Sequence, residues 1–336
     1  MAPAAAPPAS VLVYVGLDRV GDSLLKLPFV RGLRHAFPAA RLTWVAGKET
    51  SVYAGVMAPL VAGLLDEVIE NAGIGRHPGE LIGPRPLGGR GFDLVIDTQR
   101  IVWTTLSLTR VPHRVFLSPA AHFLFSSKRP PKGYRFPRSM QRQMLDLLEL
   151  ASDRSFPTPA TLDIPLDEAL RAEAARLLPD GPIYIGIAPG SGGRPKCWPL
   201  ENFIALARRQ AERGRVPVFV LGPQEIGWQA ELKAAVPEAL FPLQAGGPGP
   251  GHGFAPPFTI ALAQRFAAAV ANDSGVGHMF AIGGRPLVSL FGSTIPEKFM
   301  PMTAKLAVVR ATDYGGQEMR LIPLERVADE VEKALA

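Results

Sequence analysis

Three short stretches of the chain combine small residues with charged or polar ones in a way that suits chemistry on a phosphorylated substrate. They are residues 16–23, 189–198 and 272–278. Each follows an apolar run that predicts a buried strand, and each leads toward a predicted helix. Ligands of parallel α/β proteins bind at the carboxyl ends of strands, and unpaired N–H groups at helix starts attract anions. We therefore expect anionic ligand groups at these three places.

The stretch at 272–278 reads Asn-Asp-Ser-Gly-Val-Gly-His. Gly275 and Gly277 carry no side chain, so an anion could approach their backbone closely. Asp273 could cap the following helix or accept hydrogen bonds from a ligand. A capped turn that binds nothing explains this stretch alone equally well.

The stretch at 16–23 resembles a phosphate-binding P-loop with one change. Asp22 stands where the phosphate-binding lysine should be, and a carboxylate there would repel phosphate, which excludes a P-loop NTPase. Two interpretations of Asp22 remain open. It is either the N-cap of the next helix or a general base beside a cleft.

The stretch at 189–198 places Ser191, three glycines and Lys196 after a predicted strand. A glycine-rich turn with one ammonium group suits a diphosphate, because backbone N–H groups and the lysine together neutralise its charge. The alternative is a plain surface turn, since clusters of glycine and proline usually form loops.

The elements that position these stretches alternate along the chain and predict an α/β fold with two Rossmann-like domains, whose parallel sheets face across a cleft. We place the domains at residues 1–160 and 166–336, joined by a proline-rich linker at 156–165, with the last helix a candidate to pack back on the first domain. The first half has predicted strands at 11–16, 41–46, 68–70, 92–97 and 114–117, and helices at 21–37, 50–60, 101–108 and 138–151. The second half has strands at 183–188, 216–221, 267–271, 286–291 and 306–309, and helices at 166–178, 200–213, 226–235, 259–266, 279–282 and 323–335.

Composition predicts a soluble cytoplasmic protein without a cofactor. The chain has 336 residues, 47% of them hydrophobic, and a single cysteine, Cys197, which fits a reducing compartment. No apolar run approaches the roughly 20 residues of a transmembrane helix. The chain lacks the sequence motifs of dinucleotide enzymes and of serine hydrolases. It also lacks the zinc-protease motif and an Asp-x-Asp pair for a metal–diphosphate, and its six histidines are scattered, so we predict no metal site.

The positive charge is concentrated in one segment, residues 98–145, which holds nine of the 36 basic residues and no acidic one. The net charge of +6 is therefore a property of this segment alone. A local basic surface predicts an anionic partner such as a phosphorylated substrate or an acidic lipid headgroup, although a solvated face is the simpler alternative. We expect no nucleic-acid binding, because no RNA- or DNA-binding motif is present.

Taken together, the motifs resemble glycosyltransferase family 9, the ADP-heptose:lipopolysaccharide heptosyltransferases. Gly-Asp-Ser-Leu-Leu-Lys-Leu-Pro at 21–28, Pro-Gly-Ser at 189–191 with Lys-Cys-Trp-Pro at 196–199, and 272–278 followed by Leu-Phe-Gly-Ser-Thr at 290–294 occur in family order and spacing. The resemblance implies a GT-B architecture, with the acceptor bound mainly by the first domain and the nucleotide sugar by the second.

The resemblance also implies an inverting, metal-independent transfer with roles for particular residues. Asp22 matches the catalytic carboxylate, and Lys196 matches the lysine that neutralises the departing diphosphate, with Ser191 in the same loop. The other residues implied at the donor are Asp273, Ser274, Gly275, Val276, Gly277, His278 and, as a ribose-binding acid, Glu225. The basic residues that we assign to the acceptor are Arg19, Lys128, Arg129, Lys132 and Arg135.

The expected reaction moves a sugar, heptose from ADP-heptose by resemblance, to a lipopolysaccharide core or related anionic glycolipid, with peripheral association at the inner membrane. Gly16 stands where the family often has a lysine or arginine, and Val276-Gly277 replaces a proline-containing version, so the sugar and the acceptor stay open. The alternative is a non-catalytic nucleotide- or glycan-binding GT-B module. The presence of both Asp22 and Lys196 favours the enzyme.

Overall fold

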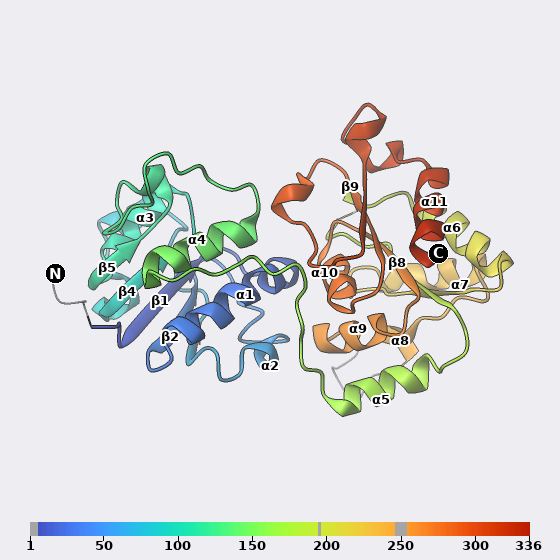
Figure 1. Cartoon of the computed structure of the whole chain (residues 1–336), viewed down its shortest axis with the longest axis horizontal. Helices are drawn as coiled ribbons and strands as arrows, with labels where there is room; N and C mark the ends of the chain where they lie inside the picture. The colour runs from blue at the N-terminus through green and yellow to red at the C-terminus, as the bar shows by residue number, and fades with distance from the viewer. Residues whose placement is uncertain (1–5, 194–195, 246–253) are drawn as a thin grey trace. The chain divides into compact units, whose positions relative to one another are not determined.

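The computed structural model describes residues 6–193, 196–245 and 254–336, and the chain divides into two compact units, Met1–Thr158 and Pro159–Ala336. The division falls inside the proline-rich stretch at 156–165. Each unit contains a five-stranded, entirely parallel sheet with helices on both faces (Figure 1). The predicted α/β fold class with two Rossmann-like domains is thus confirmed.

The sheet of the first unit has the order β3-β2-β1-β4-β5. Its central strand is buried on both faces, which is why the strand is an almost unbroken run of apolar residues. In the register, Val11 pairs with Leu42 on one side and with Leu94 on the other. The strands are β1 (Ser10–Val15), β2 (Arg41–Ala46), β3 (Glu67–Ile69), β4 (Phe92–Asp97) and β5 (His113–Leu117).

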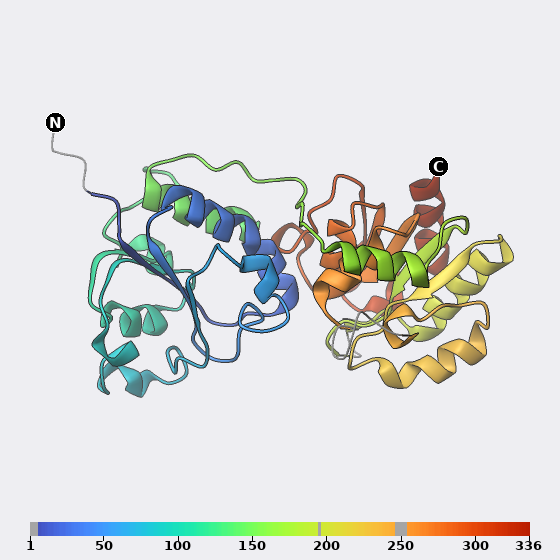
Figure 2. The same cartoon turned by 90° about the horizontal axis from the view of Figure 1, so that it is seen from below.

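Helices α1 (Val20–Ala36) and α4 (Met140–Ser152) pack together on one face of this sheet, and α3 (Val102–Thr109) covers the other (Figure 2). Each matches a predicted helix within two residues. The predicted helix at 50–60 is wrong, because turns occupy 52–57 and only the four-residue α2 (Ala58–Val61) follows. Gly55 disfavours a continuous helix, and Pro59 is tolerated only in the first turn of one.

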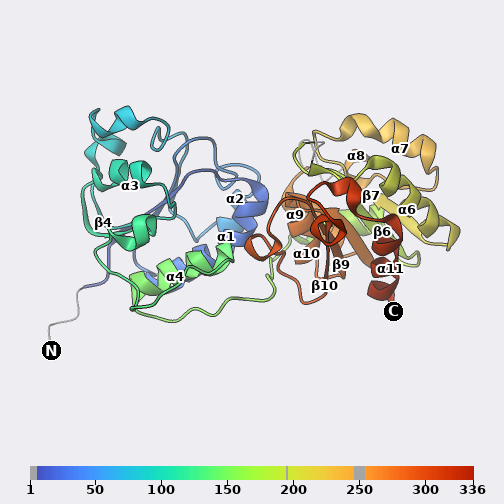
Figure 3. The same ribbon diagram turned by 90° about the horizontal axis from the view of Figure 1, so that it is seen from above.

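The sheet of the second unit has the order β10-β9-β8-β6-β7. Helices α5, α9 and α10 pack together, and α6 and α11 cover the opposite face (Figure 3). The last helix, α11, packs against β8, β9, β10 and α6 of its own unit. The strands are β6 (Tyr184–Ala188), β7 (Val216–Phe219), β8 (Ala268–Asn272), β9 (Leu287–Phe291) and β10 (Leu306–Arg310), and the helices are α5 (Glu168–Leu177), α6 (Leu200–Glu212), α7 (Gln229–Ala235), α8 (Pro242–Ala245), α9 (Pro256–Ala263), α10 (Gly275–Ile282) and α11 (Leu324–Leu335).

Because every strand pair is parallel, the loops that follow the strands of one unit meet at one edge of its sheet. In the first unit these are the loops after β1, β4 and β5, and in the second the loops after β6, β7, β8 and β9. All three stretches singled out in the sequence lie at such carboxyl edges. No helix in the part of the chain that the structure describes is long and apolar enough to cross a membrane.

Candidate active site

Asp22 lies in the first turn of α1 and is partly exposed. The N-cap of this helix is Arg19, and no side chain caps it, so the interpretation of Asp22 as an N-cap is wrong. Within the described residues the carboxylate has no hydrogen-bonded or ionic partner, and the helix dipole favours a negative charge there. Asp22 is therefore a partly exposed carboxylate at the carboxyl edge of the first sheet.

The loop before Asp22 is anchored by a carboxylate that the sequence reasoning missed. The Asp18 side chain is fully buried, and it accepts hydrogen bonds from four side chains. The donors are Ser23 Oγ at 2.6 Å, Trp44 Nε1 at 2.9 Å, Lys26 Nζ at 3.1 Å, and Ser51 Oγ. Because these donors come from α1, β2 and the loop after β2, Asp18 joins three parts of the unit.

Two more contacts fix the same turn. The hydroxyl of Tyr53 donates to the backbone carbonyl of Ser23 at 2.6 Å, and Lys26 Nζ donates to the carbonyl of Leu17 at 3.1 Å. Ser23 follows Asp22 directly, so its side chain and its carbonyl are both held in place. The buried network therefore fixes the backbone that presents Asp22.

A second buried carboxylate, Asp97, ends β4 at the same edge. It accepts hydrogen bonds from Thr105 Oγ1 at 2.6 Å, Ser118 Oγ at 2.8 Å and the N–H of Gln99 at 2.8 Å. Burial raises the pKa of Asp97 to about 6, against the opposing effect of these hydrogen bonds. Asp97 ties the loops after β4 and β5 together, and the sequence reasoning did not find it.

The basic residues assigned to the acceptor do not form one group. Arg19, Lys132 and Arg135 are exposed, and within the described residues no acidic side chain pairs with them. Arg129 donates to the carbonyl of Leu124 at 3.3 Å. Lys128 pairs with Asp153 at 2.6 Å and lines a hollow with the first residues of β4 and β5, at the opposite edge of the sheet from Asp22.

The second unit brings the three predicted donor-site residues Ser191, Lys196 and Asp273 into one pocket of about 290 Å³. They come from the loops after β6 and β8. The sequence reasoning did not assign the other lining residues to the site, although it quoted three of them in the third motif. These are Gly292, Ser293, Thr294, Gln317 and Met319.

The loop at 189–198 is held to the end of β8 by Asn272, which is completely buried. Its Oδ1 accepts from the N–H of Trp198 at 3.0 Å, and its Nδ2 donates to the carbonyl of Pro189 at 2.8 Å. Ser191 Oγ donates to the carbonyl of Asp273 at 2.8 Å. Residues 194 and 195 of this loop lie outside the described residues. The amide of Asn272 thus clamps both ends of the loop that carries Lys196.

Helix α10 begins at Gly275, four residues before the predicted start, and its N-cap is Ser274. Ser274 Oγ accepts from the N–H of Gly277 at 3.4 Å, so the interpretation of Asp273 as the cap is wrong. The N–H of His278 donates to the carbonyl of Ser274. These two N–H groups are therefore used within the helix, and those of Gly275 and Val276, at its first two positions, remain for an anion.

His278 lies in α10 with 6% of its surface exposed. Burial lowers the pKa of His278 to about 4, so the imidazole is neutral at neutral pH. Its Nδ1 has no hydrogen-bond partner in the described structure. His278 therefore carries no charge, and Lys196 is the cation among the described residues that line the pocket beside Asp273.

Glu225 follows β7 and reaches the loop after β6. A Cβ placed on Gly190 would lie 2.4 Å from Glu225 Oε1, so a larger residue at that position would have to displace the Glu225 carboxylate. Burial raises the pKa of Glu225 above its ordinary value. Glu225 is not part of the lining of the Lys196 pocket, but it borders the same loop.

The chemistry available at this edge suits an anion held by backbone and lysine. In residues 6–193, 196–245 and 254–336, no group of three or more histidine, cysteine, aspartate or glutamate side chains could hold a metal ion. A polar pocket with one lysine, hydroxyl groups and a helix start fits a phosphate or diphosphate group.

The chain is similar to a known family and to several solved structures. The family model of glycosyltransferase family 9 (heptosyltransferase) matches residues 84–321. The lipooligosaccharide heptosyltransferase 2 of Haemophilus influenzae is 30% identical over 137 residues, which are 40% of this chain and 38% of that protein. The chain thus aligns with well under half of the length of that relative.

Solved structures share the fold over nearly the whole chain. A glycosyltransferase of family 9 from Veillonella parvula has a TM-score of 0.69 and 22% identity, over 97% of both chains. The ADP-heptose lipopolysaccharide heptosyltransferase II of E. coli has a TM-score of 0.66 and 21% identity, over 97% of this chain and 98% of that one. The E. coli heptosyltransferase WaaC, solved with ADP, has a TM-score of 0.64 and 19% identity, over 97% and 99%.

Proposed function

The chain belongs to glycosyltransferase family 9, the heptosyltransferase family, and from this premise we propose that it is an inverting, metal-independent glycosyltransferase. The proposed donor is ADP-heptose, and the proposed acceptor is a lipopolysaccharide core or related anionic glycolipid. The observation that carries the proposal is the pocket of Ser191, Lys196 and Asp273, which joins two of the family motifs at one sheet edge.

The donor assignment rests on charge and on relatives. Lys196 and the N–H groups of Gly275 and Val276 suit a diphosphate, and Glu225 is our candidate for the ribose hydroxyls. One relative of known structure was solved with ADP and another is described as an ADP-heptose enzyme, which supports an ADP-linked donor here.

In the proposed reaction an acceptor hydroxyl oxygen attacks C1 of the donor sugar. The new bond joins that oxygen to C1, and the bond between C1 and the diphosphate oxygen breaks with its electron pair on the diphosphate. Asp22 takes the hydroxyl proton as the attack proceeds. Lys196 and the start of α10 stabilise the negative charge that develops on the leaving diphosphate. Attack opposite the leaving group inverts the configuration at C1.

The acceptor is proposed to be anionic because Arg19, Lys132 and Arg135 are exposed and unpaired within the described residues. An acceptor of this kind is embedded in a membrane, so we further propose a cytoplasmic protein that associates reversibly with the cytoplasmic face of the inner membrane through these cations. No nucleic acid is part of the proposed function.

The decisive experiment replaces Asp22 with asparagine and follows sugar transfer and ADP binding separately. Asp22→Asn keeps the size of the side chain but removes the base, so turnover should fall about 10²–10⁴-fold with ADP affinity unchanged. Asp163→Asn, an exposed carboxylate in the linker region, is the matched control and should keep full activity. Activity of Asp22→Asn within a few-fold of wild type would refute the base assignment.

A second variant tests the donor side. Lys196→Met should weaken ADP binding by about tenfold or more, because a charge-assisted contact to phosphate is lost. ADP binding equal to that of wild type would contradict the assignment of Lys196. A wild-type protein that binds ADP but neither transfers nor hydrolyses a nucleotide sugar would instead indicate the non-catalytic module.

A further inference from the structure

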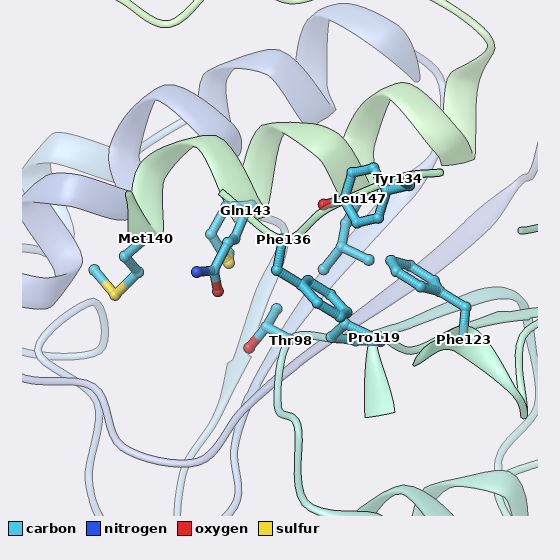
Figure 4. Close-up of a pocket in the computed structure, with 9 residues that line it drawn as sticks. Thr98, Pro119, Phe123, Tyr134, Phe136, Met140, Gln143 and Leu147 are labelled. Carbon is cyan, nitrogen blue, oxygen red and sulfur yellow. The ribbon is translucent and has the colours of Figure 1, made fainter. Parts of the chain in front are cut away.

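The chain has hollows outside the pocket of Lys196, and their sizes decide which of them could hold a ligand. One lies beside the start of α4, where the rings of Phe123 and Phe136 form part of its lining (Figure 4). Water molecules can occupy only about 40 Å³ of it, and Arg100 and Phe123 already lie against the Phe136 ring. This hollow has room for a few water molecules but not for a larger ligand.

A hollow of the second unit is much larger by the same measure. Its volume of about 500 Å³ is within the range of small-ligand sites, about 300–1,000 Å³. It lies where α5 and the ends of α9 and α10 meet, and Figure 1 shows α9 between the other two helices. Its lining residues 264–265 precede β8 and 283–285 precede β9, so it is at the amino edge of the sheet. The pocket of Lys196 is at the carboxyl edge, so a ligand in one does not block the other.

Small residues leave the space between the helix ends unfilled. Gly284 has a φ of 75°, and a Cβ added to it would have no other atom within 4 Å. At Gly283 the two helices approach so closely that a Cβ would lie 2.6 Å from the Cβ of Ala263. The lining on α9 includes Ala261. No long side chain is therefore available at these positions to fill the hollow.

The charge at the hollow is positive. Arg171 comes from α5, Arg265 follows α9 and Arg285 follows α10. Among the described residues that line the hollow, none is acidic. Three cations around one space repel one another, and an anion bound between them would remove that repulsion.

Two of the guanidinium groups are held in place by backbone carbonyls. Arg285 Nε donates to the carbonyl of Gln264 at 3.0 Å, and Arg265 Nε donates to the carbonyl of Leu178 at 2.9 Å. Both Nη groups of Arg285 have no acceptor in the described residues. Because an anchored guanidinium presents a fixed fork of N–H groups, it loses little side-chain entropy when it binds a phosphate.

The acidic partners of the other two arginines compete only weakly with a ligand. Arg265 pairs with Asp180 and Arg171 pairs with Glu168, the latter at 3.5 Å. The two carboxylates are 96% and 84% exposed. Exposed ion pairs contribute little stability, because water solvates both charges, so a bound anion can replace these carboxylates.

A simpler explanation is that these arginines only cap helix ends. Leu178 and Gln264 are the C-caps of α5 and α9, and their carbonyls attract cations. Capping accounts for the Nε groups of Arg265 and Arg285. It does not account for the free Nη groups of Arg285 or for Arg171, whose side chain makes no hydrogen bond to backbone in the described residues.

We propose that this hollow is a second anion site, which binds a small, soluble phosphorylated molecule independently of the donor pocket. The Nη groups of Arg285 donate to two oxygens of one phosphate, a geometry that arginine matches better than lysine. Arg171 and Arg265 contribute further positive charge. The side-chain amide of Gln264, which has no partner in the described residues, can bond another polar group of the ligand. This inference does not depend on the proposed function.

The test is titration calorimetry with inorganic pyrophosphate in the presence of saturating ADP. Wild type and Lys196→Met should both bind pyrophosphate, because the donor pocket takes no part. Arg285→Gln should weaken this binding about tenfold or more, as the loss of a charge-assisted contact to phosphate would. Arg171→Gln should weaken it in the same direction. Arg326→Gln is the matched control, since Arg326 also pairs with a glutamate but on α11, and it should bind like wild type.

Two results would overturn the proposal. If wild type bound no pyrophosphate once ADP was present, a second site would not exist. If Arg285→Gln, Arg171→Gln and Arg326→Gln all bound like wild type, the arginines would only cap helix ends. Arg285→Gln also loses a hydrogen bond to Gln264, so its unfolding midpoint is measured in urea. Should it be destabilised, Arg171→Gln decides the question, because no backbone contact is lost there.

A lipid headgroup could supply the same phosphate chemistry, and vesicles separate the two sources. Arg171→Gln combined with Arg285→Gln should sediment with phosphatidylglycerol vesicles like wild type while losing pyrophosphate binding. A double variant that lost vesicle binding but kept its pyrophosphate affinity would show a membrane-binding surface instead, and the proposal would be wrong.

Discussion

At the scale of single residues, the stability of the first unit depends on a buried ion pair. Asp18 and Lys26 side chains are 0% and 7% exposed. Asp18→Asn leaves the Lys26 ammonium buried without its counter-ion, which we expect to cost about 3–5 kcal/mol of unfolding free energy. Urea unfolding at neutral pH measures the cost, and Asp18→Asn combined with Lys26→Met should regain part of it because no lone charge remains.

The control for this prediction is an ion pair at the surface. Lys333 and Glu330 form one on α11, with the lysine 63% exposed. Lys333→Met should change stability by less than about 1 kcal/mol, because water already solvates both charges. An Asp18→Asn variant as mild as this control would show that Asp18 does not anchor the loop before Asp22.

His278 predicts a dependence of stability on acid. Its folded pKa of about 4 lies below the ordinary value of 6.5, so between these values the unfolded chain binds the extra proton. The stability that comes from keeping His278 neutral in the fold is fully present above pH 6.5. As pH falls toward 4, the free energy of unfolding decreases by about 3 kcal/mol in all. The stability of His278→Asn, measured by urea unfolding at several pH values, should fall less than that of wild type over this interval; equal losses in both would contradict the assignment.

Asp97 acts in the opposite direction, since its raised pKa lowers stability as pH rises from 3.8 to 6.

The proximity of Ser191, Lys196 and Asp273 could be predicted from residue types and spacing, because each residue follows a strand of one parallel sheet. They were not enough for Asp18 or Asn272, whose roles depend on donors up to 74 positions away in sequence. Local pattern also misassigned the cap of α10, since Asp273 and Ser274 are both good N-caps and only the backbone geometry selects Ser274.

At the scale of elements, the loops after β6 and β7 touch at Gly190 and Glu225. Gly190→Ala would place a Cβ within 2.4 Å of Glu225 Oε1 and displace the carboxylate or the loop. If Glu225 binds the ribose, ADP affinity should fall about tenfold. Gly227→Ala is the control, because a Cβ added at that position would have no neighbouring atom within 4 Å, and calorimetric titration with ADP compares the two. Equal affinities would remove Glu225 from the site.

The strands were predicted from the sequence because parallel strands buried on both faces are continuous apolar runs, as β8 and β9 are. Helices with a strong apolar stripe, such as α6 and α11, were also predicted from the sequence. The start of α10 could not be predicted, because Gly275 and Gly277 disfavour a helix and tertiary packing overrides them. A Cβ at position 277 would lie 3.1 Å from the carbonyl oxygen of Asn272, a tight contact that favours glycine there.

At the scale of the whole molecule, the two units have similar folds but differ in the distribution of charge. Both sheets have five parallel strands. The strand that comes first in the sequence of each unit is interior to its sheet: β1 lies between β2 and β4, and β6 lies between β8 and β7. The excess of positive charge lies in residues 98–145 of the first unit. Sequence alone showed this asymmetry, but not that Arg142 and Lys128 are neutralised by Asp146, Glu149 and Asp153.

The cations left unpaired predict a reversible attachment of the whole protein to anionic membranes. Lys132, Arg135 and Arg138 are exposed, and a basic residue near an anionic leaflet contributes about 1 kcal/mol. Replacing all three with glutamine should therefore weaken sedimentation with phosphatidylglycerol vesicles about 100-fold. The same replacement at Lys233, Arg285 and Lys305, exposed residues of the second unit, changes net charge equally and should have little effect. Raising salt from about 0.1 to about 1 M shortens the screening length from about 10 to about 3 Å and should release wild type. Equal losses in the two triple variants would mean that net charge, not this segment, sets the attachment.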